Sequence, residues 1–251
     1  MKRVPSTAVA AFLIATVLAA VPPAATAQST DSQIKAEVQR QLARVDSGLA
    51  RLDLEVQSGV VRVSGDIATL WFKEEAVKRL LKVEGVTSVE AQLTIPSAES
   101  DAALAREVAD RIRHYDLYTV YDTIDGRVQH GAVRLDGAVT EPKKAADIHE
   151  RVAKVKGVQA IDDRLVVLPA SRADDRLRVT IANGIYRDEA FLNYSMVDPP
   201  VHVIVNNGHV TLIGYVRSDI ERIKAESVAR SVNGVLALDN KIQVVGPSAR
   251  K

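Results

Sequence analysis

Residues 208–216 read Gly-His-Val-Thr-Leu-Ile-Gly-Tyr-Val, and residues 59–67 and 131–139 follow the same pattern. This pattern, Gly-x-Val-x-(Val or Leu)-x-Gly-x-(Ile or Val), alternates apolar residues with others, which predicts a strand that buries one face. A second marker, Val-x-Gly-Val, begins at residues 83, 155 and 232, and its glycine follows the second glycine of the first pattern by 20 residues each time. Matches at one spacing in three places indicate an internal repeat.

Each repeat is interpreted as helix, strand, strand, helix, strand. The opening helix carries apolar residues at helical spacing, such as Ile34, Val38 and Leu42 in the first repeat. A strand precedes each Gly-x-Val pattern and joins it through a turn, for which Asn206-Asn207-Gly208 is well suited. A second helix fills the 20-residue interval and ends at the marker glycine, and a last strand follows. In the second repeat the hairpin region, residues 121–131, is longer and more polar than the hairpin regions of the other two repeats, so the first strand of this repeat is the least clearly predicted.

The predicted fold class is therefore α+β, with three tandem αββαβ modules. In each module, two helices pack on one face of a small three-stranded mixed sheet. We expect repeat 1 at residues 31–95, repeat 2 at 101–168 and repeat 3 at 174–245, joined by short spacers. Modules this small have little core, so neighbouring repeats are expected to touch. The recurring glycines are expected to be structural positions: Gly59, Gly65, Gly85, Gly131, Gly137, Gly157, Gly208, Gly214 and Gly234.

Residues 1–27 have the features of a secretory signal peptide. Lys2 and Arg3 precede an apolar run from residue 8 to 21, and Ala-Thr-Ala at 25–27 predicts cleavage before Gln28. The chain is therefore expected to be exported and soluble, and periplasmic if its source is a Gram-negative bacterium. It contains no cysteine, which excludes disulfides and a cysteine-linked lipid anchor.

Charge and motifs argue against several classes of function. The chain has 33 Lys and Arg residues against 32 Asp and Glu residues, a balance that argues against a nucleic-acid-binding protein. Neither a Gly-x-Ser-x-Gly nucleophile motif nor a phosphate-binding glycine loop occurs, so an enzyme is not expected. None of the five histidines has the spacing of a metal site, and we expect no metal and no cofactor. His202 and His209 are the one pair that the third hairpin could bring face to face.

The two markers resemble those of the BON domain, a module of osmotically inducible periplasmic proteins and outer-membrane lipoproteins. The resemblance covers the chain after the signal peptide as three tandem repeats, and it is strongest in repeat 3 and weakest in the hairpin of repeat 2. It implies a non-enzymatic module associated with phospholipid binding, envelope integrity and osmotic or stress response. It supplies no catalytic or ligand-binding residue.

Aromatic and basic clusters are the candidate contact sites. Aromatic rings with a polar edge suit a membrane interface or a protein contact, but they can equally close a small core. Basic residues on one helix can attract anionic headgroups, although a solvated helix face is the commoner explanation. Phe72 lies where the other repeats have charged residues, so we expect it to be exposed or against a neighbouring repeat. The candidates are Trp71, Phe72, Tyr115, Leu117, Tyr118, Lys143, Lys144, Arg151, Lys154, Tyr186, Phe191, Leu192 and Tyr194.

Two hypotheses remain open at this point. In the first, three modules bind phospholipid or the envelope surface through loop aromatics and a modest basic face, as a peripheral membrane contact. In the second, the modules form a protein-interaction or chaperone-like scaffold that presents sheet edges and apolar patches to envelope proteins.

Overall fold

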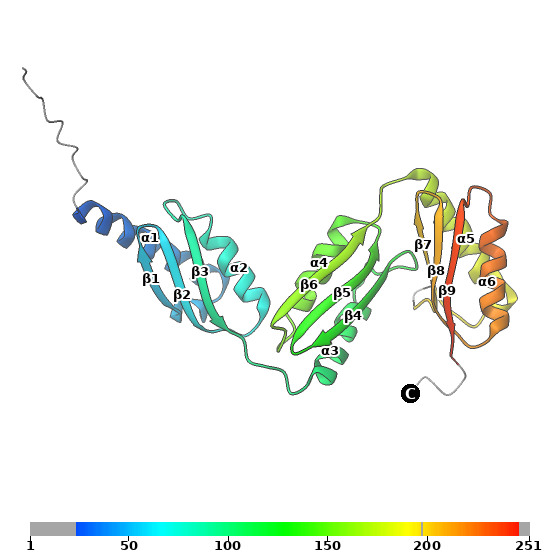
Figure 1. The fold of residues 1–251 in the computed structure, drawn as a ribbon, viewed down its shortest axis with the longest axis horizontal. Coiled ribbons are helices and arrows are strands. Elements are labelled where there is room, and N and C mark those ends of the chain that lie inside the picture. The colour runs from blue at the N-terminus through cyan, green and yellow to red at the C-terminus, as the bar shows by residue number, and fades with distance from the viewer. Residues whose placement is uncertain (1–23, 197, 246–251) are drawn as a thin grey trace, which may run out of the picture.

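The structure, a computed structural model, describes residues 24–196 and 198–245. It contains three separate three-stranded sheets, each accompanied by a pair of helices, arranged one after another along the chain (Figure 1). In every sheet the second strand lies in the centre, antiparallel to the first and parallel to the third. The predicted fold of three αββαβ modules is confirmed.

The element bounds follow the same order in each repeat. Repeat 1 contains α1 (Ala24–Val45), η1 (Leu49–Arg51), β1 (Asp53–Gln57), β2 (Val60–Asp66), α2 (Leu70–Leu80) and β3 (Ser88–Thr94). Repeat 2 contains α3 (Asp101–Arg113), β4 (Thr123–Gln129), β5 (Ala132–Val139), α4 (Pro142–Ala153) and β6 (Ala160–Val167). Repeat 3 contains α5 (Arg172–Arg187), η2 (Glu189–Phe191), β7 (Val201–Asn206), β8 (His209–Val216), α6 (Asp219–Ser231) and β9 (Ala237–Val244).

The first strand of repeat 2 forms despite its polar sequence. β4 pairs with β5 over seven residues, from Thr123 opposite Ala138 to Gln129 opposite Ala132. Backbone hydrogen bonds to the central strand do not depend on apolar side chains, so the ladder holds with little burial. Of the predicted signal peptide, residues 1–27, the first 23 residues lie outside the described residues, and residues 24–27 belong to the start of α1. Within the described residues, no helix is long and apolar enough to cross a membrane.

The recurring glycines stand where a side chain does not fit. All nine have a positive φ, and Gly214 shows the reason most clearly. Its φ is +144°, and an added Cβ would lie 1.9 Å from the carbonyl oxygen of Pro200. In the hairpin turn of the same repeat, Asn207 and Gly208 have φ values of +50° and +77°, as a tight two-residue turn requires. The pattern therefore encodes backbone geometry.

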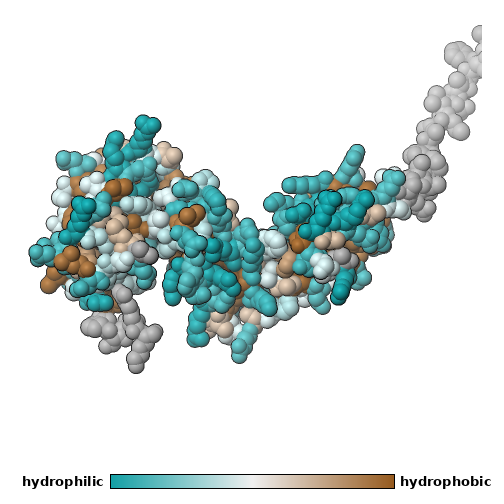
Figure 2. All heavy atoms as spheres, turned by 180° about the vertical axis from the view of Figure 1, so that it is seen from behind, coloured by the Kyte–Doolittle hydropathy of each residue, from teal (hydrophilic) through white to brown (hydrophobic). Residues whose placement is uncertain are grey.

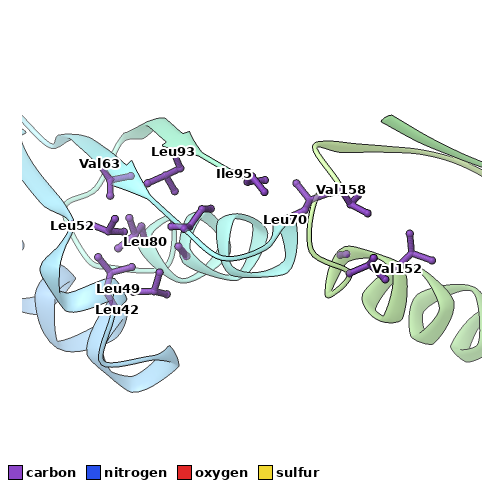
Figure 3. Packing of buried hydrophobic residues seen from close by; sticks show 14 of the residues in the cluster. Leu42, Leu49, Leu52, Val63, Leu70, Leu80, Leu93, Ile95, Val152 and Val158 are labelled. Atoms are coloured by element: carbon purple, nitrogen blue, oxygen red, sulfur yellow. The ribbon is translucent and has the colours of Figure 1, made fainter. Parts of the chain in front are cut away.

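The apolar helix positions predicted from the sequence face two hydrophobic cores. One core is continuous through repeats 1 and 2, and the other fills repeat 3. Figure 3 shows where the first core crosses from one repeat to the next: Leu70 and Ile95 of repeat 1 lie beside Val158 of repeat 2. The second core includes the buried Val120, which comes from repeat 2. Each repeat thus shares apolar contacts with its neighbour, as its small size predicts.

Candidate contact surfaces and the junctions between repeats

One carboxylate on the first helix of each repeat holds the hairpin turn of that repeat. Asp174 accepts hydrogen bonds from the backbone N–H groups of Asn207 (2.8 Å) and Gly208 (2.9 Å). Asp31 and Asp101 make the same pair of contacts in repeats 1 and 2. The two donors hold the pKa of Asp101 below its usual value. Sequence reasoning missed this contact, although each Asp stands three residues before the first buried apolar residue of its helix.

Three of the candidate residues lie in the junction between repeats 1 and 2. Trp71 and Phe72, at the start of α2, are half-buried against the shared core, and their ring centroids lie 5.0 Å apart, edge to face. The Lys154 ammonium of repeat 2 stands 4.8 Å from the centre of the Trp71 ring, a cation–π contact. Phe72 is thus partly buried against the core that the two repeats share, and a contact with the neighbouring repeat stays a prediction.

An imidazole also joins these two repeats. The Nε2 atom of His149, on α4, lies 3.2 Å from the Glu74 carboxylate of α2. Its Nδ1 atom lies 3.4 Å from Asp163 of β6. The two carboxylates face opposite nitrogens of the ring, so they do not converge on one metal position, and the contact is structural. No group of three or more metal-binding side chains occurs within the described residues.

The junction between repeats 2 and 3 is built from the segment that precedes β4. The carbonyl oxygen of Val120 accepts a hydrogen bond from the N–H of Val203 (2.8 Å), on the edge strand β7. The Tyr118 ring lies 5.4 Å from the ring of His202, and burial there lowers the pKa of His202. Leu117, by contrast, stays exposed. Tyr118 is thus part of a contact between repeats. The segment that carries it can bond to β7 because an edge strand leaves backbone groups unpaired on its outer side.

A buried ion pair supports this segment. The Nζ of Lys144 lies 2.7 Å from Asp122, and their side chains are 7% and 1% exposed. Asp122 also accepts hydrogen bonds from the backbone and hydroxyl of Thr119 and of Thr140. Burial raises the pKa of Asp122, but these donors outweigh burial and keep it below the usual value. The prediction that Lys144 presents its charge to headgroups is wrong, because Asp122 already takes up that charge inside the protein.

The remaining basic residues of α4 are largely paired. Lys143 bonds Asp147, which also accepts a hydrogen bond from the Tyr115 hydroxyl (2.8 Å). The Arg151 guanidinium stands 4.9 Å from the centre of the Tyr115 ring. Tyr115 itself is buried, so its prediction as a surface contact is also wrong: burial raises its pKa to about 12. The helix face is therefore close to neutral and offers little excess charge.

In repeat 3 the aromatic residues close one end of the core. Phe191 is fully buried, with Tyr186 at 6.1 Å and Tyr194 at 5.7 Å between ring centroids. The Tyr186 hydroxyl donates to the carbonyl of Val201 (2.6 Å), and the Tyr194 hydroxyl donates to Glu221 (3.1 Å). Phe191 is thus not the surface contact predicted, and the alternative of core closure describes these three rings.

The histidine pair proposed for the third hairpin is not formed. The register of β7 and β8 places His202 opposite Ile213, and His209 opposite Asn206. The two imidazoles therefore stand at different pairs of the ladder and do not face one another. The two-residue turn of the hairpin fixes this register, which the alternation of apolar and polar residues in the sequence does not specify by itself.

Exposed apolar residues gather on repeat 3. Of the twelve large apolar side chains exposed within the described residues, eight belong to this repeat. Leu192, after η2, is 68% exposed, and Ile220 and Ile223 on α6 are 67% and 56% exposed. These three residues belong to two adjoining parts of the module, because η2 packs against α6, and we call them the apolar end of repeat 3. In Figure 2 hydrophobic atoms are visible on the outer end of repeat 3, at the left.

Comparison with known proteins places these modules in a family. The model of the BON domain matches residues 30–97, 100–169 and 189–246. The chain belongs to the BON domain family. The third match begins after α5, although α5 packs on its own sheet and helix as α3 does in repeat 2. The nine glycines and the apolar helix positions described above are thus features of three BON modules.

Solved structures similar to this chain include proteins of type III secretion systems, and no curated protein matches the chain. One is CdsD, a structural protein of the type III secretion system of Chlamydia trachomatis, at 15% identity, with 84% of this chain and 94% of CdsD covered and a TM-score of 0.24. Another is the PrgH periplasmic domain, at 13% identity, with coverages of 78% and 95% and a TM-score of 0.21. A further PrgH structure, from S. typhimurium, is 14% identical, with coverages of 81% and 98% and a TM-score of 0.21.

Proposed function

We propose that this chain is an exported, non-enzymatic binding protein of the periplasm, delivered by the signal peptide at residues 1–27. In this proposal, its three BON modules contact phospholipid at the envelope surface, in the context of envelope or osmotic stress. Family membership supports the general role, because BON modules are associated with phospholipid binding and envelope integrity.

The observation that carries the proposal is the apolar end of repeat 3. Leu192, Ile220 and Ile223 are all more than half exposed, and apolar side chains in such a cluster mark sites of membrane or protein contact. Two cations stand near these residues: Arg217, which lies over the Tyr194 ring, and Lys224, which is 54% exposed and 3.7 Å from Asp188. In the proposed contact they exchange part of these interactions for anionic headgroups. The contact proposed is peripheral, through shallow insertion of side chains between headgroups.

Co-sedimentation with vesicles tests this proposal. We expect binding to vesicles that contain anionic phospholipid, and a loss of at least about tenfold in affinity when Leu192, Ile220 and Ile223 are all changed to Ser. The matched control is Leu81→Ser, which removes a side chain that is 54% exposed on repeat 1. Equal binding of the triple variant and the control would refute a contact through the apolar end of repeat 3.

A second function, a protein-interaction scaffold, is supported by the two junctions. The Lys154 contact with Trp71 and the Val120 contact with β7 hold successive repeats in defined contact, which suits a platform for a protein partner. In a pull-down from envelope extract, a defined partner retained in detergent would favour this function, and the same partner should be lost in the Leu192, Ile220 and Ile223 triple variant. Vesicle binding without such a partner favours the lipid contact instead.

A further inference from the structure

All six asparagines of the chain lie in repeat 3, and three of them are followed by glycine. The three pairs are residues 183–184, 207–208 and 233–234. An asparagine before glycine is prone to deamidation, because glycine has no side chain to hinder attack by its backbone nitrogen on the asparagine amide. The fold places these pairs in a helix, in a hairpin turn and in a marker loop, so their backbone environments differ.

Two of the three pairs are held by hydrogen bonds. Asn183 and Gly184 lie inside α5, where each backbone N–H donates to the carbonyl oxygen four residues earlier. Val228 of α6 also packs on Gly184, where an added Cβ would lie 2.6 Å from its Cγ1 atom. Gly208 is buried in the hairpin turn, and its N–H donates to a carboxylate oxygen of Asp174 (2.9 Å). In both pairs the nitrogen that would attack already donates a hydrogen bond.

The third pair is open. Asn233 and Gly234 are both exposed, in the loop that joins α6 to β9. No acceptor for the Gly234 N–H is found among the described residues. A hydrogen bond from the N–H of Val235 to the carbonyl oxygen of Val232 closes this turn, and at 3.4 Å it is longer than usual. Local opening of such a loop costs little free energy, so the Gly234 nitrogen can rotate towards the Asn233 side chain.

We propose that Asn233 is a site of spontaneous deamidation in the folded protein, and that Asn183 and Asn207 are protected. The Gly234 nitrogen loses its proton to solvent and forms a bond to Cγ of Asn233. The bond from Cγ to Nδ2 breaks, and ammonia leaves with a proton taken from water, so the first product is a cyclic imide. Water then opens the imide at either carbonyl, which leaves aspartate or isoaspartate with a new carboxylate.

The product changes the marker loop of repeat 3. A groove of about 570 Å³ lies beside this loop and is lined in part by Arg176, Leu177 and Asn233. The new carboxylate therefore lines a groove that also contains a cation. Isoaspartate in addition lengthens the backbone of the loop by a methylene group. This modification goes beyond the proposed lipid contact, because it needs no ligand and involves none of the residues of the apolar end of repeat 3.

Peptide mapping by mass spectrometry tests the proposal on the folded chain, residues 28–251, incubated at mildly alkaline pH. The rate of deamidation at Asn233 should exceed the rates at Asn183 and Asn207 at least about tenfold, because a hydrogen bond has to break before those two react. In guanidinium chloride, which unfolds the chain, the three rates should become comparable. Equal rates in the folded chain, or a preference for Asn233 that persists after unfolding, would overturn the proposal.

Two matched variants test the cause of the protection. Asp174→Ala removes the acceptor of the turn in repeat 3 and should raise the rate at Asn207 at least about fivefold. Asp101→Ala removes the same turn contact in repeat 2, where no asparagine occurs, and should change none of the three rates. Asn183 is the control for folding, because its rate rises when α5 opens. An unchanged rate at Asn207 in folded Asp174→Ala would refute protection by Asp174, and the comparison in the wild-type chain holds without either variant.

Discussion

Lys144→Met removes the charge that compensates Asp122 while it keeps an unbranched apolar side chain. The Asp122 side chain is 1% exposed, so the variant leaves an uncompensated carboxylate inside repeat 2. Breaking a buried pair by removing one partner costs about 3–5 kcal/mol of the free energy of unfolding. The neighbouring Lys143 is 67% exposed, and Lys143→Met should cost less than about 1 kcal/mol. Urea denaturation followed by circular dichroism compares the two variants.

The pH dependence of the same variant supplies a second readout. In the wild-type protein burial alone would raise the pKa of Asp122, but the hydrogen-bond donors around it, led by Lys144, hold the pKa below its usual value. The stabilisation that ionised Asp122 gives the folded protein is therefore complete above about pH 4 and is lost as the pH falls through the folded pKa. Without Lys144, burial has less opposition and the pKa rises. The folded variant then binds a proton more readily, so its loss in free energy of unfolding relative to the wild-type protein should be smaller at pH 4.5 than at pH 7. Equal costs for Lys144→Met and Lys143→Met at pH 7 would refute a buried, charged pair.

Three further predictions concern the fold and its second junction. Gly214→Ala should cost about 3 kcal/mol or more in urea denaturation, because its Cβ would meet the Pro200 carbonyl, whereas Gly126→Ala, whose Cβ would meet only side chains, should cost much less. Asp174→Ala should cost about 1–3 kcal/mol by the same assay, because it strips two turn N–H groups of their acceptor, and no cost would contradict the turn contact. Because burial lowers the pKa of His202, the junction of repeats 2 and 3 should be fully stable above about pH 6.5 and weaken as the pH falls below it. Limited proteolysis at pH 7 and pH 5 measures this, and His202→Gln should abolish the difference.

Regular backbone geometry was predictable from the sequence because it repeats. Positive φ at the glycines and burial of the helix positions depend on short-range periodicity, and three repeats at one spacing make that periodicity unmistakable. The turn-binding aspartates were within reach of the same comparison, since Asp31, Asp101 and Asp174 recur at one place in the repeat. That signal was available in the sequence and was missed.

Pairing between distant residues was not predictable in this way. Lys144 reads as a surface charge until Asp122, 22 residues earlier, is known to be buried beside it. Tyr115 reads as a loop aromatic until its hydroxyl is placed on Asp147. The apolar end of repeat 3 was found only in part, because Ile220 and Ile223 are exposed by the orientation of α6 on its sheet. Contacts of this kind depend on packing between elements, which one sequence without homologues does not specify.

Amide hydrogen exchange on the chain with and without anionic vesicles tests the central claim that three linked BON modules bind through repeat 3. We expect added protection at residues 189–194 and 219–224, with the exchange of repeats 1 and 2 unchanged. Protection centred on α4, around Lys143 and Arg151, or no change anywhere in repeat 3, would contradict the account.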